Sequence, residues 1–300
     1  MKSLNQLFAG LMLLIALPAA AEIKVFACEP EWAALVQELG GDKVSVSTAT
    51  TARQDPHHIE ARPSLIARLR QANLLVCTGA ELEIGWLPVL LRQAGNARVQ
   101  PGQPGYFEAA NHVRMLEIPA RIDRTDGDIH PGGNPHIQTD PRNIGAVAAA
   151  LSQRLSEIDP AGANHYQTRL RDFAQRWNAA IKRWEQQAAP LKGVRIVVQH
   201  RGFPYLESWL GLREVAALEP KPGIDPTSTH LTEVLEQLRR QPVKMILCAA
   251  YSDGRASEWL ADRAKIPTVI LPFTVGGSDK AGDLFSLFDD TVQRLLGALK

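Results

Sequence analysis

The sequence has almost no excess charge and, after its first twenty residues, no long apolar run. Lys and Arg number 33 and Asp and Glu number 32, so the formal net charge at pH 7 is only +1. A balance this even gives no field that would attract nucleic acid or an anionic membrane, and we expect no nucleic-acid partner. Beyond the N-terminus, no segment approaches the roughly 20 apolar residues needed to span a bilayer.

Cysteine is scarce as well. The chain has three cysteines, an odd number that does not suit a disulfide framework. Cys28, Cys77 and Cys248 each end an apolar, strand-like run, which favours buried, inert thiols over metal ligands. A bridge between Cys28 and Cys77 stays open, because an oxidising compartment would permit it.

Local catalytic signatures are also missing. The sequence contains no H-E-x-x-H, no G-x-S-x-G and no G-x-x-x-x-G-K-[ST] segment. Such motifs place a metal, a nucleophile or a phosphate cradle on one short stretch of chain. Without them no short segment of the sequence indicates catalysis, and we expect that the protein is not an enzyme.

The N-terminus reads as an export signal. Residues 1–21 combine one early Lys, an apolar run from Leu7 to Leu17 and three alanines before Glu22. This arrangement is typical of a secretory signal peptide with an A-x-A cleavage site. We therefore expect a soluble mature protein in the periplasm, beginning near Glu22. A lipid anchor is not expected, because Cys28 follows charged residues instead of the apolar run.

Short apolar runs bounded by turn residues alternate with helical patterns in both halves of the chain. The runs cover residues 23–28, 44–48, 74–78 and 113–116, and then 194–199, 214–218, 244–249 and 268–271. Continuous β-branched runs separated by helices are typical of parallel strands that are buried on both faces. The pattern predicts an α/β protein of two lobes, each with a four-stranded parallel sheet flanked by helices.

One uninterrupted helical segment separates the two sets of strands. Apolar side chains recur every three or four residues from Tyr166 to Trp184, without an intervening Gly or Pro. This predicts one helix of about 26 residues, roughly 39 Å long, that joins the lobes rigidly. The expected organisation is a signal peptide at 1–21, an N-terminal lobe at 22–160, the connecting helix at 161–190 and a C-terminal lobe at 191–300.

Three of the eight histidines stand where a strand or helix pattern breaks. His57 follows the second predicted strand, His136 precedes a helix that begins at Asp140-Pro141, and His200 directly follows a strand. Loops at the carboxyl ends of parallel strands line the crevice where ligands bind. These three side chains are therefore candidate ligands of one site.

Asp279 is a fourth candidate, because it follows the last predicted strand. Ser278 and Asp279 would equally serve to cap the final helix. Three imidazoles and one carboxylate suit tetrahedral Zn²⁺. The candidates are far apart in the sequence and lack the H-x₃₋₅-H or C-x₂-C spacing of structural zinc modules, so their spacing alone is weak evidence.

Five segments together resemble the successive motifs of the zinc and manganese substrate-binding proteins of ABC importers. They are residues 55–88 (beginning DPHHIEARPS), 133–144 (GNPHIQTDPRNI), 197–212 (beginning VVQHRGFPY), 219–238 and 274–290 (beginning TVGGSDKAGD). In this order they cover nearly the whole mature chain. The resemblance implies two α/β lobes joined by one backbone helix. It also implies a carrier that captures Zn²⁺ in the interlobe cleft and delivers it to an inner-membrane ABC permease. We expect a monomer.

The family motifs imply His57, His136, His200 and Asp279 as the ligand set. Two positions stay open at this stage. His58 is the immediate neighbour of His57, and Asp283 is a weaker alternative to Asp279.

Rival interpretations concern the ion and the activity. A manganese- or iron-binding member of the same family is the first alternative, although manganese members usually offer two carboxylates and a nitrogen-rich set favours zinc. A secreted zinc hydrolase with Asp279 or Glu60 as its base is a weaker one. The loop at 119–141, which carries Asp123, Asp126, Asp128 and His130, is a candidate for handing ions to the site.

Overall fold

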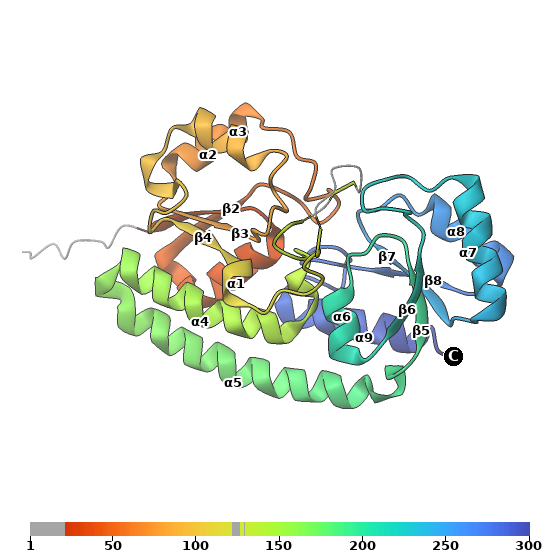
Figure 1. The fold of residues 1–300 in the computed structure, drawn as a ribbon. Helices are drawn as coiled ribbons and strands as arrows, with labels where there is room; N and C mark the ends of the chain where they lie inside the picture. The colour runs from red at the N-terminus through yellow and green to blue at the C-terminus, as the bar shows by residue number, and fades with distance from the viewer. Residues whose placement is uncertain (1–21, 122–126, 129) are drawn as a thin grey trace, which may run out of the picture.

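The computed structural model describes residues 22–121, 127–128 and 130–300. The expected signal peptide therefore lies outside the described residues. In the described part, two lobes sit side by side above a layer of long helices (Figure 1).

The N-terminal lobe is built on four parallel strands. They are β1 (Ile23–Ala27), β2 (Val44–Thr48), β3 (Leu74–Cys77) and β4 (Tyr106–Glu108), in the sheet order β2-β1-β3-β4. Its flanking helices are α1 (Pro30–Gly40), α2 (Pro63–Gln71) and α3 (Leu87–Ala94). Every residue of β3 is buried, as expected for a central strand covered on both faces.

The fourth strand of this lobe is not where the sequence suggested. Residues 113–116 were expected to be a strand, but β4 lies at Tyr106–Glu108, where Phe107 pairs with Val76. The backbone of Leu116 bonds elsewhere: its N–H donates to the Tyr205 hydroxyl, and its carbonyl accepts from the Asn134 N–H. Segment 113–116 thus links the two lobes instead of extending the sheet.

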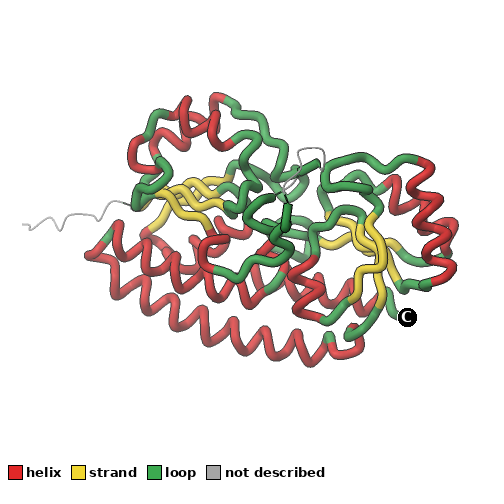
Figure 2. The backbone as a smooth tube through the Cα atoms, in the orientation of Figure 1, coloured by secondary structure: helices red, strands yellow, loops and turns green. Residues whose placement is uncertain are grey.

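The C-terminal lobe repeats the same topology. Its strands are β5 (Arg195–Val198), β6 (Arg213–Ala217), β7 (Met245–Ala249) and β8 (Thr268–Leu271), in the order β6-β5-β7-β8, all parallel. Its helices are α6 (Pro204–Leu210), α7 (Ser228–Arg240) and α8 (Arg255–Ala264). Figure 2 shows both small sheets enclosed by helices and loops. The predicted fold class is confirmed.

Three long helices form the layer beneath the lobes (Figure 1). They are α4 (Pro141–Ile158), α5 (Ala163–Gln187) and the last helix, α9 (Leu284–Gly297). Helix α5 has 25 residues and runs beneath both lobes (Figure 1). Trp177 donates its indole N–H to the Pro141 carbonyl at 2.7 Å, and Trp184 donates to Asp289 at 2.6 Å. The aromatic stripe predicted along this segment therefore fastens α5 to α4 and α9.

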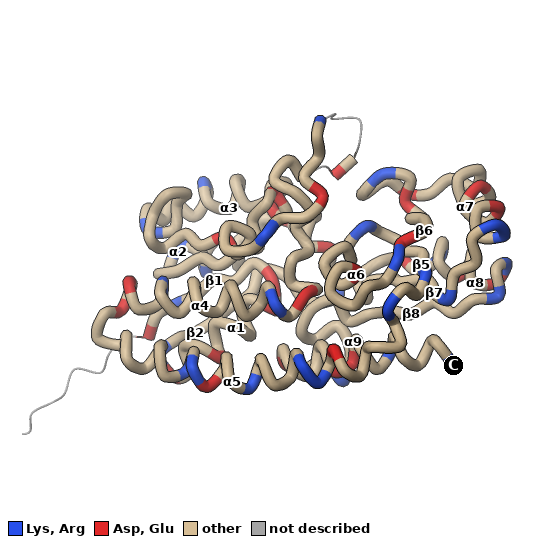
Figure 3. The backbone as a smooth tube through the Cα atoms, turned by 60° about the horizontal axis from the view of Figure 1, so that its bottom comes forward, with Lys and Arg blue, Asp and Glu red and all other residues tan. Residues whose placement is uncertain are grey.

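The largest cluster of buried apolar side chains crosses the lobe boundary, whereas two smaller clusters each lie within one lobe. One cluster runs from Ile23 in β1 through Trp177 in α5 to Leu295 in α9. Lys, Arg, Asp and Glu are interspersed along α5 and over both lobes (Figure 3), consistent with the even charge balance. The exact domain limits given above stay a prediction.

The cysteines differ partly from expectation. Cys28 and Cys77 form a disulfide between the ends of the neighbouring strands β1 and β3, so the preference for free thiols was wrong for this pair. Cys248 is free and buried, as predicted. Because parallel neighbours end at the same sheet edge, their Cα atoms lie only 4.8 Å apart, within bonding range.

Candidate metal centre

Three histidines from distant parts of the chain meet between the lobes. His57 lies between β2 and α2, His136 lies before α4, and His200 lies two residues after β5. One ring nitrogen of each lies within 4.8 Å of the others. The structure therefore brings together three of the four predicted ligands.

The spacing of the rings suits a tetrahedral ion. The Nε2 atoms of His136 and His200 are 3.3 Å apart. Zinc–nitrogen bonds of about 2.0–2.1 Å at tetrahedral angles put neighbouring nitrogens about 3.3–3.4 Å apart. His136 and His200 thus already stand at the separation of two ligands on one zinc ion.

Carboxylates orient two of the rings. His57 Nδ1 donates to Asp55 at 2.7 Å, and His200 Nδ1 donates to Glu219 at 2.7 Å. Glu219 also accepts the Gly223 backbone N–H at 2.8 Å, which fixes its position. With each Nδ1 protonated, Nε2 keeps a free lone pair, the arrangement usual for metal-binding histidines.

Burial favours the neutral form of His136. Removal from water lowers the pKa of His136 well below its ordinary value, and the neighbouring His57 and His200 lower it further. Although burial raises the pKa of Asp55, the hydrogen bonds from His57 and the charges of His57 and His58 together outweigh burial and lower that pKa. Neutral imidazole is the form that binds a metal ion.

Several buried nitrogens in this region have no hydrogen-bond partner. They include Nε2 of His57 and Nδ1 of both His136 and His130. A buried polar atom without a partner is costly and needs an explanation, such as a bound ion. At His57 the unpartnered atom is the one opposite the Asp55 contact, where a metal ligand is expected.

Backbone contacts hold the loops that carry the ligands. Trp86 donates its indole N–H to the Pro56 carbonyl at 2.9 Å. Asn134 accepts the His136 backbone N–H at 3.1 Å and donates to the Arg201 carbonyl at 2.8 Å. The loops before α4 and after β5 are thus tied across the lobe interface.

His57, and not His58, belongs to the group. The His58 side chain is 66% exposed, and its Nε2 lies 3.7 Å from Asp128. The His57 side chain is only 5% exposed. Two adjacent histidines point differently because Asp55 holds the first by both its ring and its backbone N–H.

Asp279 does not join the three histidines in this structure. It is exposed, and Ser278 beside it donates to Asp290 at 2.6 Å, which draws the turn onto α9. Asp283 is also occupied, since it caps α9 through the Ser286 N–H at 2.7 Å. The cap of the last helix is therefore Asp283, not Ser278 or Asp279. On the C-terminal-lobe side, the ring of Phe273 lies 5.3 Å from that of His136.

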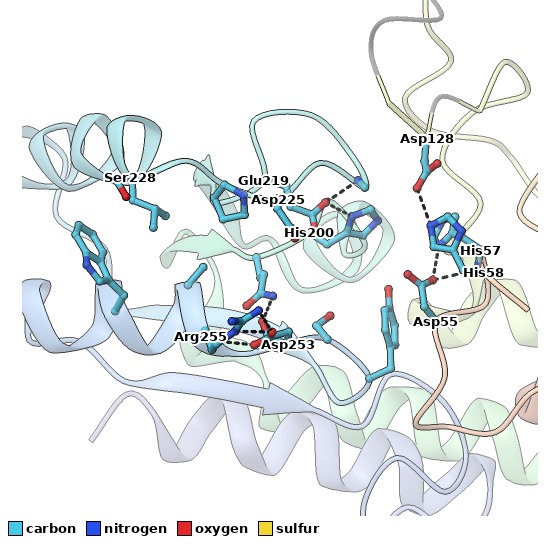
Figure 4. A pocket seen from close by; sticks show the side chains of 18 residues that line it. Asp55, His57, His58, Asp128, His200, Glu219, Asp225, Ser228, Asp253 and Arg255 are labelled. Atoms are coloured by element: carbon cyan, nitrogen blue, oxygen red, sulfur yellow. Dashed lines mark hydrogen bonds and ion pairs between the residues drawn. The ribbon is translucent and has the colours of Figure 1, made fainter.

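A cavity of about 580 Å³ opens beside the histidines, and His57 and His200 form part of its wall (Figure 4). Five carboxylates and one guanidinium also line it: Asp55, Asp128, Glu219, Asp225, Asp253 and Arg255. Arg255 is paired with Asp253 at 2.6 Å. The space next to the candidate metal centre is therefore strongly acidic.

His130 is a further histidine close to the group. Its ring lies 5.4 Å from that of His57, and burial lowers its pKa to about 4. Asp123 and Asp126 of the same loop lie outside the described residues. The proposed role of this loop in handing over ions stays a prediction.

The remaining histidines have ordinary structural contacts. The His112 ring stacks on Phe107 at 4.8 Å. His165 and His230 each bond through Nε2 to a backbone carbonyl, of Gly40 at 2.8 Å and of Ala217 at 3.1 Å.

Sequence reasoning missed the two orienting carboxylates. Asp55 stands two residues before His57, and Glu219 directly follows a predicted strand. A carboxylate at a strand end or beside a ligand motif is the signal that would have identified both.

Comparisons with known proteins agree with this geometry. A family profile described as zinc-uptake complex component A, periplasmic, matches residues 25–298. The chain belongs to this family. It is 26% identical over 260 residues to the high-affinity zinc uptake system protein ZnuA of Paracoccus denitrificans, covering 75% of this chain and 76% of that protein.

Other members are named for a different metal. The manganese ABC transporter substrate-binding lipoprotein PsaA of Streptococcus anginosus is 22% identical over 299 residues, covering 95% of this chain and 94% of the relative. A crystal structure of ZnuA superposes with a TM-score of 0.78 at 21% identity, covering 93% of this chain and all of the other. The predicted membership among substrate-binding proteins of ABC metal importers is confirmed.

Members of this family bind metal ions and work with a membrane permease and its ATPase. In the described part of the chain, no helix has both the length and the apolar character to cross a membrane.

Proposed function

We propose that this protein captures Zn²⁺ at His57, His136 and His200 in the periplasm and delivers it to an ABC importer. The observation that carries the proposal is the convergence of three ring nitrogens within 4.8 Å, two of them 3.3 Å apart. Both lobes contribute, so the ion would be held where the lobes meet. The export signal supports the compartment, and a monomeric state stays a prediction.

The donor set favours zinc over manganese. All three grouped side chains offer nitrogen, and nitrogen ligands favour ions late in the Irving–Williams order. The nearest carboxylates, Asp55 and Glu219, already accept hydrogen bonds from the rings. A manganese or iron carrier is the alternative, since one relative is named for manganese.

The two residues considered as the base of a zinc hydrolase lie away from the histidines. Both candidate bases, Glu60 and Asp279, are exposed, and neither lines the cavity beside the histidines. The absence of hydrolysis of model esters and phosphates by zinc-loaded protein is the expected result.

The test is the metal content of protein purified without added metal, followed by competition titration of the metal-free protein with Zn²⁺ and Mn²⁺. We expect one zinc per chain, three imidazoles in the X-ray absorption spectrum and much tighter binding of zinc. Tighter binding of manganese, or a spectrum dominated by carboxylate oxygen, would refute the assignment.

A further inference from the structure

We propose that the cavity beside the three histidines binds a small amine- or imidazole-bearing chelator together with the metal ion. The cargo would then be a metal complex and not the ion alone. This inference rests on the proposed function, because the histidines supply the metal that the chelator also binds.

The size of the cavity is the first argument. A bare ion held by three rings needs no adjoining space, yet about 580 Å³ lies next to them. Sites for small organic ligands have volumes of about 300–1,000 Å³. Figure 4 shows the space extending from His200 toward Ser228 at the start of α7.

The coordination of the metal is the second argument. In the described part of the chain, the grouped ring nitrogens are three, whereas tetrahedral zinc takes four ligands. Phe273 covers one side of His136 with an apolar ring. His57 and His200 form part of the cavity wall, and Nε2 of His57 is buried without a partner. The His130 ring lies 5.4 Å from that of His57, but His130 is not among the grouped nitrogens. The fourth coordination position is therefore left to a donor that enters from the cavity.

The charge of the cavity defines the class of chelator. The described residues that line the cavity include five carboxylates and one guanidinium. Zn²⁺ offsets only two negative charges, so the wall stays negative after the ion binds. A polyanionic chelator such as citrate would be repelled, whereas a neutral or cationic complex, such as zinc with one histidine, would be attracted.

The test is equilibrium dialysis of the metal-free protein against labelled L-histidine, with and without Zn²⁺, and against labelled citrate with Zn²⁺. We expect about one histidine per chain only when zinc is present, and no citrate. Retention of zinc but of no labelled histidine, in the sample that contains both, would overturn this inference and leave the proposed function intact. Failure to bind zinc alone or with histidine would refute the proposed function itself. Equal retention of citrate would overturn the argument from charge.

Two matched variants locate the chelator. Ser228 and its neighbour Thr229 are both exposed in the first turn of α7, but only Ser228 lines the cavity. We expect Ser228→Trp to reduce zinc-dependent histidine retention at least tenfold and Thr229→Trp to leave it unchanged. Titration with zinc alone checks that both variants keep the metal centre. Equal histidine retention by the two variants would place the chelator elsewhere and overturn the proposal.

Discussion

Each orienting carboxylate affects metal binding through the histidine that it holds, and it does not bind the metal itself. Glu219 accepts from Nδ1 of His200, which fixes both the tautomer and the direction of the ring. Glu219→Gln keeps the shape but loses the charge, and we expect zinc affinity to fall about 10–100-fold. Isothermal titration calorimetry provides the measurement. Glu214→Gln, in β6 and outside the cavity lining, is the control and is expected to bind normally.

The ligands themselves have a larger expected effect. His136→Ala and His200→Ala each remove one of three nitrogens, and we expect each to weaken zinc binding by more than tenfold. His165→Ala, whose ring bonds to a backbone carbonyl of the N-terminal lobe, serves as the control in the same competition assay. Near-native affinity of both ligand variants would remove the basis of the proposed centre.

At single positions, the sequence predicted which residue types form the site. It did not always identify which of two nearby residues of the same type takes part. His57 and His58 have the same local context, and only the contact with Asp55 separates them. Asp279 and Asp283 both precede the last helix. Their positions depend on the hydrogen bond from Ser278 to Asp290 and on the cap that Asp283 forms with Ser286. The local sequence does not show which of these contacts will form.

At the level of elements, seven of the eight predicted runs became strands close to their expected limits. The exception is β4, which is three residues long and gives little periodic signal. The competing run, 113–116, is equally apolar, but its backbone partners come from α6 and the loop before α4. Such long-range pairing decides a short edge strand, and local sequence does not encode it.

The disulfide between β1 and β3 is expected to stabilise the folded protein. It joins residues 49 apart in the sequence, so it restricts the unfolded chain considerably. We expect Cys28→Ala with Cys77→Ala to lower the free energy of unfolding by about 2–4 kcal/mol, measured by urea denaturation. Zinc affinity should change less than twofold, because neither sulfur contacts the three histidines. Unchanged stability would show that the bridge contributes little.

Across the whole molecule, one buried carboxyl group connects the lobes. The Thr274 hydroxyl, after β8, donates to Glu31 in α1. Burial raises the pKa of Glu31 from 4.5 to about 7. The folded state therefore binds this proton more tightly than the unfolded state. The resulting stabilisation is present below pH 4.5 and is lost as pH rises to about 7.

Glu31→Gln tests this linkage in the metal-free protein. Compared with wild type, we expect the variant to gain about 2–3 kcal/mol of unfolding free energy between pH 5 and pH 8. His136 is present in both proteins, so its own titration largely cancels in the difference. Glu233→Gln, at an exposed site on α7, should show no such gain. Parallel pH profiles for Glu31→Gln and wild type would contradict the prediction.

The apolar cluster that runs through α5 and α9 from one lobe to the other has a thermodynamic consequence. Each lobe also has a smaller cluster of its own, around Leu90 and around Ile246. The larger cluster is shared, so melting one lobe exposes apolar side chains of the other. We expect a single calorimetric transition whose van't Hoff enthalpy matches the measured heat. Two resolved transitions would show that the lobes are independent. Each lobe produced alone would expose its part of the shared cluster, and we expect it to be much less stable than the whole protein.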